Sequence, residues 1–458
     1  MAVTDTLSEY FDVEEHDSTV RTETIAGLTT FLTMSYIIVV NPVILSNAIV
    51  IDGYSPEQVF QMLAIATILA SIVAIAVMAF WANRPFGLAP GMGLNAFFVT
   101  VVVVLDLATW QTALAAVFVE GLLFMALTAL GARRYIIELF PDPVKFAVGA
   151  GIGLFLLLIG FQQMNVIEAD ADSGVLLGDV AADPVALLAL AGLALTFVLW
   201  ARGLKGSIVI GILLTAAAGW ALTIGGVVEQ GILAPETLPD PHYDITPLVG
   251  AFIDGLVEVD PLNFALLVFV FFFVDFFDTA GTLIGVSQVG GFLDEEGNLP
   301  EMEKPLMADA VGTTFGAIVG TSTVTTYIES STGIEEGGRT GLTALVIGGL
   351  FVISLIAVPV VAAIPGYAAN IALVVVGIIM LQGVADIDWT DARWSIPAGL
   401  TITLMPLTNS IANGLAAGLI SYPIIKAGIG EYDDIHPGVW LIAIALIFYY
   451  YIRYGGVL

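Results

Sequence analysis

Long apolar runs repeat along nearly the whole chain, and they constrain its fold more than any other feature. Runs of about 17 to 25 apolar residues, each long enough to cross a bilayer core of about 30 Å, follow one another between short polar breaks. The chain of 458 residues is 58% hydrophobic and only 12% charged, whereas soluble proteins carry roughly 25% charged residues. The sequence therefore predicts an all-α polytopic membrane protein.

The apolar runs predict fourteen transmembrane segments, seven on each side of a long acidic connection. Because seven is odd, the two halves enter the membrane from opposite sides, as in the inverted repeats of secondary transporters. The pattern is weakest where Gly and Thr interrupt it and where one long run breaks around Pro406 and Asn413. The predicted segments are 24–47, 59–81, 87–105, 109–131, 144–165, 184–201, 206–226, 262–285, 305–320, 321–338, 340–364, 366–386, 394–427 and 437–454.

The basic residues predict the orientation of these segments, since cytoplasmic loops carry an excess of Lys and Arg. If the N-terminus is cytoplasmic, all twelve Lys and Arg residues except Lys426 fall on the inside. The outside loops 48–58, 166–183 and 227–261 contain neither residue type. We therefore expect a multi-pass protein of the cell membrane with both termini cytoplasmic. Residues 1–23 lack the pattern of a signal peptide, so the first segment is expected to direct insertion.

The net charge of −30 predicts a salt-rich environment of halophilic type and excludes a basic nucleic-acid footprint. The chain contains no cysteine, which rules out disulfides and thiolate metal sites. Neither a metal site nor a cofactor is expected, and nucleic acid is not an expected partner. The lipid bilayer is an expected partner of the chain.

Two glycine-rich stretches at corresponding places in the halves indicate a binding site. They are GLAPGMGLNAFF at 87–98 and GTSTVTTYIESSTG at 320–333, and each surrounds one strongly polar side chain, Asn95 or Glu329. Irregular backbone at membrane depth persists only where protein buries it or where it lines a cavity. Unwound segments in both halves are the strongest sequence sign of a transporter's binding site.

Two aspartates lie in the apolar stretch FVFFFVDFFDTAGTLIGV at 269–286. On a helix, Asp275, Asp278, Thr279 and Thr282 fall in one stripe about 100° wide, which predicts a polar face turned toward a water-accessible cavity. A carboxylate at mid-membrane costs about 2.5–3.5 kcal/mol. A structural role as a helix cap or as the partner of a distant Arg stays open, more so for Asp275. In the first segment, Thr29, Thr33 and Tyr36 share a face, which lines the cavity or bonds a neighbouring helix.

Four motifs follow one another along the chain: TIAGLTTFLTMSYIIVVNP at 24–42, PGMGLNAFF at 90–98, FVDFFDTAGTLIGV at 273–286 and GTSTVTTYIESSTGIEEGGRTGLTAL at 320–345. In this order they resemble the AzgA-like purine permeases of the nucleobase–cation symporter-2 superfamily, and the resemblance runs from about residue 20 to 455. It implies a core domain of segments 1–4 (24–131) and 8–11 (262–364). It also implies a gate domain of segments 5–7 (144–226) and 12–14 (366–454). The acidic stretches 1–23 and 227–261 are expected to form the cytoplasmic N-terminus and the outside connection. Segments 3 and 10 would each contribute a short strand.

The resemblance implies secondary active import of adenine, guanine or hypoxanthine, coupled to protons. Sodium in place of the proton stays open as an alternative, because the composition indicates a salt-rich environment. Homodimers are known in the superfamily. The acid of segment 8 that grips the base matches Asp278 best, with Asp275 as the second choice, and Glu329 and Asn95 match the polar groups of segments 10 and 3. Asp278 and Glu329 are the expected proton carriers. The further lining residues are Thr279, Thr282, Thr33 and Phe97, the last as a ring that stacks on the base.

Three other functions compete with this interpretation. An intramembrane aspartyl protease also buries two acids, but on separate facing helices, whereas Asp275 and Asp278 share one. An anion exchanger or channel on the same fold would favour positive charge or bare helix N-termini at its site over acids. A permease for uracil, xanthine or urate is disfavoured by the motifs but stays open.

Overall fold

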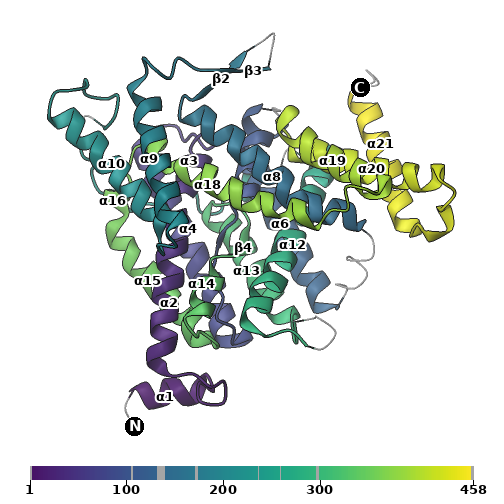
Figure 1. Cartoon of the computed structure of the whole chain (residues 1–458), viewed down its shortest axis with the longest axis horizontal. Coiled ribbons are helices and arrows are strands. Elements are labelled where there is room, and N and C mark those ends of the chain that lie inside the picture. The colour runs from purple at the N-terminus through teal and green to yellow at the C-terminus, as the bar shows by residue number, and fades with distance from the viewer. Residues whose placement is uncertain are drawn as a thin grey trace. The chain divides into compact units, whose positions relative to one another are not determined.

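The computed structural model describes residues 3–104, 107–131, 140–170, 174–235, 237–257, 259–294 and 299–454. Arg133 and Arg134, two of the expected cytoplasmic basic residues, lie outside these ranges. Within them, nine helical stretches are long and apolar enough to cross a bilayer, which confirms a predominantly helical multi-pass membrane protein (Figure 1). These stretches are Val20–Leu45, Pro56–Ala82, Trp110–Ala129, Asp142–Gln163, Pro184–Ala201, Ser207–Ile224, Pro261–Gly290, Gly341–Val361 and Gly366–Asp386.

The chain divides into two compact units. Unit 1 comprises Met1–Ala129 with Gly160–Val375, and unit 2 comprises Leu130–Ile159 with Val376–Leu458. Both the glycine-rich stretches and the helix that carries the two aspartates belong to unit 1. The site is therefore built within one unit.

Two short strands pair antiparallel inside unit 1. β1 (Leu88–Pro90) lies against β4 (Val324–Thr326), with Ala89 opposite Thr325. Gly91 makes this close approach possible, because a Cβ at that position would stand 2.8 Å from the Thr325 methyl carbon. β1 continues into helix α5 (Met92–Val99), and β4 is soon followed by α14 (Ser330–Glu335). Each glycine-rich stretch is thus a buried strand followed by a short helix.

Helix α12 (Pro261–Gly290) carries both aspartates and is unusually long. Its 30 residues span about 45 Å at 1.5 Å per residue, more than the bilayer core. The Asp260 side chain caps its first turn, and the helix ends at Gly291, whose positive φ of 67° is a conformation that glycine adopts freely. Its phenylalanines pack against α6 (Trp110–Ala129), so this helix is anchored by aromatic burial.

A buried carboxylate ties α2 (Val20–Met34) to α15 (Gly341–Ser354), which lies beside it in Figure 1. Glu23 is fully buried and accepts hydrogen bonds from the backbone N–H of Arg339 (3.0 Å), the backbone N–H of Thr340 (3.2 Å) and the Thr343 hydroxyl (2.6 Å). These bonds fix the start of α15 to the first transmembrane stretch.

The segment expected as one crossing at 394–427 is instead two helices of unit 2. α19 (Ala392–Leu407) and α20 (Ile411–Gly428) pack along each other as a hairpin. The chain reverses where Asn409 takes a positive φ of 47°, and Ser410 then caps α20 through the N–H of Asn413. The break therefore lies at residues 408–410, directly after Pro406.

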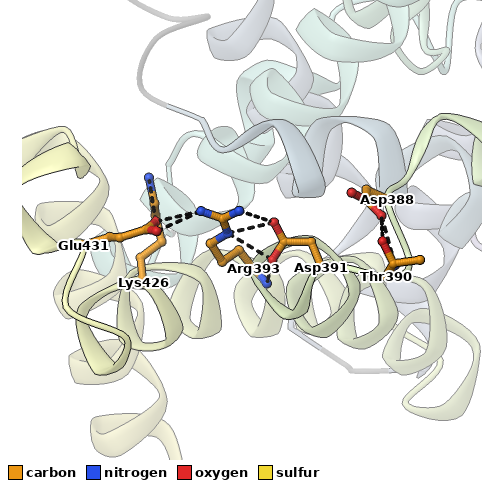
Figure 2. Close-up of polar contacts among 6 residues, drawn as sticks. All are labelled: Asp388, Thr390, Asp391, Arg393, Lys426 and Glu431. Atoms are coloured by element: carbon orange, nitrogen blue, oxygen red, sulfur yellow. Dashed lines mark hydrogen bonds and ion pairs between the residues drawn. The ribbon is translucent and has the colours of Figure 1, made fainter.

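The hairpin brings its two outer ends together in an ion-pair cluster (Figure 2). Arg393 lies 2.5 Å from Asp391 and 2.8 Å from Glu431, and Lys426 lies 4.0 Å from Glu431. Beside them, the Asp388 carboxylate accepts the Thr390 hydroxyl at 2.6 Å. Arg393 and Lys426 therefore lie at the same end of the hairpin. Lys426 was an exception to the charge alternation only because 394–427 was counted as one crossing.

Three further elements complete the description. In unit 1, α9 (Pro184–Ala201) and α10 (Ser207–Ile224) also pack as a helical pair. An antiparallel ribbon of β2 (Ile167–Asp170) and β3 (Gly174–Leu177), which the sequence analysis did not predict, precedes them. In unit 2, α21 (Pro437–Tyr454) packs on α20, where the Tyr450 hydroxyl donates to the Asn413 side chain at 2.7 Å.

Candidate functional site

One face of α12 combines a carboxylate with small residues and remains open. Asp278 is partly exposed, and Thr282 one turn further along the same stripe is partly exposed as well. A Cβ built on Gly281 or Gly285 would meet no atom within 4 Å. This face is polar at Asp278 and Thr282 and unobstructed at the two glycines. A surface that binds a flat polar ligand needs both properties.

The second exposed acid, Glu329, follows β4 and is held by a tyrosine from the first transmembrane stretch. The Tyr36 hydroxyl donates to Glu329 Oε1 at 2.5 Å, while the Tyr36 ring itself is buried. Glu329 is partly exposed, and α14, which begins directly after it, packs against α12, the helix of Asp278. Beside it, the hydroxyl groups of Thr33 and Thr332 lie 3.1 Å apart. The structure thus brings Asp278, Glu329 and Thr33 into one region.

Asn95 lies on α5, directly after strand β1, and is fully buried. Its side-chain oxygen accepts the hydroxyl of Ser322, which immediately precedes the Thr323–Thr326 run. Its amide nitrogen meets no acceptor among the residues that the structure describes. An amide with its oxygen engaged and its nitrogen unused is a ready hydrogen-bond donor.

Strand β4 is fixed to the helices around it by threonine hydroxyls and one aspartate. Thr279 of α12 and Thr325 of β4 share a hydrogen bond of 2.9 Å. Asp309 of α13 (Glu303–Val319) accepts the Thr326 hydroxyl at 2.9 Å and the Thr326 backbone N–H at 3.2 Å. Asp309 was missed in the sequence analysis, although an acid within an apolar span is a signal in itself.

The first aspartate of α12 has different surroundings from the second. Asp275 is completely buried, and its carboxyl group lies against that of Glu120 on α6, which is also completely buried. The Thr313 hydroxyl reaches Asp275 at 3.4 Å. Asp275 was expected to face water and is enclosed here instead. Glu120 was not singled out, yet it too interrupts an apolar run.

Phe97, the expected stacking ring, is buried and packs edge-on against Phe271 with ring centroids 4.8 Å apart. It offers no free face in this conformation. Phe277, next to Asp278, is partly exposed and lies at the edge of the open face.

Two observations bear on other ligands. Across the described ranges, no three His, Asp or Glu side chains are grouped so as to hold a metal ion. A pocket of ≈ 670 Å³ lies at the N-terminal ends of α6 and α12, but its only acidic lining residue is Asp260, which caps α12, and it contains none of the acids described in this section. The polar chemistry is therefore concentrated on the open face of α12 and around the strands.

Comparisons with known proteins relate this arrangement to a family. The model of the permease family Xan_ur_permease matches residues 21–416. The guanine/hypoxanthine permease PbuO of Bacillus subtilis is 41% identical, with 95% of this chain and 98% of PbuO covered. The adenine permease AdeP of Escherichia coli is 38% identical, with 96% and 95% covered.

Among solved structures, the transmembrane domain of the cyanobacterial bicarbonate transporter BicA superposes with a TM-score of 0.55. The match covers 87% of this chain and 97% of BicA's domain at 16% identity, so it shows a shared fold alone. The sequence match extends over most of the chain and includes every residue of the site described above. The chain therefore belongs to the Xan_ur_permease family, as an AzgA-like membrane transporter of the nucleobase–cation symporter-2 superfamily, and it is not an enzyme.

Proposed function

We propose that the protein imports purine nucleobases (adenine, guanine and hypoxanthine) by proton symport, and that Asp278 and Glu329 bind the base. The observation that carries the proposal is the presence of two partly exposed carboxylates in one region, Asp278 on the open face of α12 and Glu329 directly before α14, which packs on α12. The planar edge of a purine presents N–H groups, which carboxylates accept, and ring nitrogens, which need a donor. The unused amide of Asn95 is such a donor. Both relatives named above are called purine permeases, which supports the same substrate class.

Each polar residue then has a part in binding. Tyr36 holds Glu329 in place, Thr33 and Thr282 line the space, and Thr279 fixes strand β4 behind it. Phe97 would have to change its packing to stack on the base, whereas Phe277 already borders the open face. Because Asp275 is buried, it does not contact the base in this proposal and supports the site only indirectly.

For transport, we propose fourteen segments in two inverted repeats that alternate in access between the two sides. The paired strands β1 and β4, each on one glycine-rich stretch, support this symmetry. The helical pair of α19 and α20 also supports this symmetry. The two helices would be segments 13 and 14, which correspond to α9 and α10 as segments 6 and 7. The proposed core is 24–131 with 262–364, and the proposed gate is 144–226 with 366–454.

The same proposal places the protein in the cell membrane with a cytoplasmic N-terminus, and it allows a homodimer. α21 follows the fourteen segments, so a cytoplasmic C-terminus requires that α21 does not cross the membrane. A cysteine at residue 453 tests this by its labelling from one side. Sodium in place of the proton is tested by replacing sodium in the uptake buffer.

The test is uptake of radiolabelled adenine and hypoxanthine into cells that lack their own purine permeases. Wild type should take up both, uptake should fall with a protonophore, and Asp278→Asn and Glu329→Gln should each abolish it. Thr403→Ser, on an exposed position of unit 2, is the matched control and should behave as wild type. If uracil, xanthine or urate were taken up in preference to purines, the substrate class would be wrong.

An anion transporter is the second candidate, favoured only by the fold shared with a bicarbonate transporter. Two carboxylates at the open face would repel an anion. Uptake of bicarbonate without any uptake of purines would replace the proposal with this one.

A further inference from the structure

The buried acids of unit 1 differ in how they are hydrogen-bonded. Glu23 accepts three hydrogen bonds from N–H and O–H donors, and Asp309 accepts two. Neither oxygen of Glu120 meets an N–H or hydroxyl donor among the described residues. Asp275 receives only the Thr313 hydroxyl, at the long distance of 3.4 Å. Glu23 and Asp309, which hold elements together, thus receive hydrogen bonds from several donors, whereas Glu120 and Asp275 receive almost none.

The partner of each of these two carboxyl groups is the other one. The two carboxyl groups lie against each other, and because carboxylates offer only acceptors, a hydrogen bond between them needs a proton. The charged groups that face the pair among the described residues are Asp309 on α13 and Asp278 further along α12, and both are acids. Among the described residues no positively charged side chain acts on the pair, so a shared proton takes the place of one.

α6 packs closely against α13 and α12 around the pair. A Cβ on Gly121, next to Glu120, would lie 2.5 Å from the Thr314 hydroxyl and 2.9 Å from its backbone nitrogen. Phe124 of α6 packs edge-on against Phe272 and Phe276 of α12, with centroids 5.9 and 5.7 Å away. Acidic side chains are costly inside a membrane, so an acid kept there without structural donors indicates a function.

We propose that Glu120 and Asp275 form the proton-carrying site of the transport cycle, separate from the two acids that bind the base. This inference rests on the proposed function, and it assigns the coupling proton to a different place from Asp278 and Glu329. In each cycle the pair gains one proton from one side of the membrane and releases it to the other. No covalent bond other than the O–H bond forms or breaks.

The site is connected to the base-binding region by short contacts. The Thr313 hydroxyl lies 3.4 Å from Asp275 and 3.1 Å from the Val324 carbonyl, so these two acceptors compete for its one hydrogen, and its oxygen accepts the Val324 N–H at 3.0 Å. Val324 begins β4, whose Thr325 bonds Thr279, the neighbour of Asp278. A change of charge at Asp275 therefore acts on the strand that lies behind the base.

The test uses purified protein in proteoliposomes with an imposed pH gradient. With one proton per base, a gradient of one unit should let wild type accumulate adenine about tenfold, since 1.4 kcal/mol corresponds to a factor of ten. Glu120→Gln keeps the shape but cannot exchange the proton. It should lose accumulation, so that adenine only equilibrates, while it keeps adenine–adenine exchange and adenine binding. Accumulation by Glu120→Gln equal to that of wild type would overturn the proposal.

Two controls separate this inference from others. Glu23→Gln changes an equally buried acid that has donors, and it should keep accumulation. If wild type does not transport purines at all, the proposed function fails; if wild type accumulates them and Glu120→Gln does too, only this inference fails.

A second measurement tests the proposal if the Glu120→Gln variant does not fold. The infrared spectrum of wild type should show the carbonyl band of a buried protonated carboxyl group, shifted by D₂O. Asp275→Asn should lose the band. A wild type without such a band would contradict the shared proton.

Discussion

Tyr36→Phe tests whether Glu329 binds the base in the orientation seen here. The substitution removes one hydroxyl, whose bond to Glu329 Oε1 measures 2.5 Å, and leaves the buried ring in place. A hydrogen bond to a charged group contributes about 1.5–3 kcal/mol. Because Glu329 is partly exposed, water can replace part of the lost bond, and we take the lower end, about 1.5 kcal/mol. At 1.4 kcal/mol per factor of ten, the affinity for the base should fall about tenfold.

The assay is equilibrium binding of radiolabelled adenine to purified protein, with thermal unfolding of the same samples. Tyr327→Phe is the matched control, because the Tyr327 hydroxyl donates at 2.6 Å to the Pro90 carbonyl and not to Glu329. It leaves a buried carbonyl unpaired, which costs about 1–3 kcal/mol, so it should lower the unfolding temperature more than the affinity. The reasoning is refuted if Tyr36→Phe binds adenine as wild type does while Tyr327→Phe loses affinity.

Three further predictions concern the framework. Glu23→Ala leaves three donors unpaired at about 1 kcal/mol or more each, so it should lower the free energy of unfolding by roughly 3 kcal/mol; an unchanged melting temperature would contradict this. Cysteines placed at Thr390 and Ile429 of this naturally cysteine-free chain should react with an impermeant maleimide from the same membrane side, and labelling from opposite sides would exclude the hairpin. Arg393 holds the pKa of Asp391 below its usual range, so its contribution to stability is present above about pH 4 and is lost as pH falls through the lowered value. Asp391→Asn should therefore remove part of the acid sensitivity measured by thermal melting at low salt, and an unchanged pH profile would show that the pair contributes nothing.

The part of the site that follows from local pattern could be predicted from the sequence. Asp278 and Thr282 share a helical stripe, and that stripe is partly exposed in the structure. The glycine-rich stretches indicated irregular backbone, and both contain a strand. Such signals depend only on the spacing of residues along one element, and this spacing is present in the sequence itself.

What the sequence did not reveal depends on contacts between elements. Glu120 is a single acid in an apolar run, and only the packing of α6 on α12 shows that it meets Asp275. Asp309 acquires its role from Thr326, seventeen positions later. The hairpin of α19 and α20 was hidden because its turn is short and a run of apolar residues continues on both sides of it. A periodicity count cannot distinguish a turn from a kink.

Binding of purines to the acids beside α12 is the central claim, and displacement of bound adenine tests it most directly. Purified wild type and Asp278→Asn would be incubated with radiolabelled adenine at high salt, with unlabelled hypoxanthine, guanine, uracil or bicarbonate as competitors. The account predicts that wild type binds adenine, that the two purines displace it while uracil and bicarbonate do not, and that Asp278→Asn does not bind. Full binding by Asp278→Asn, or displacement by bicarbonate, would contradict the account.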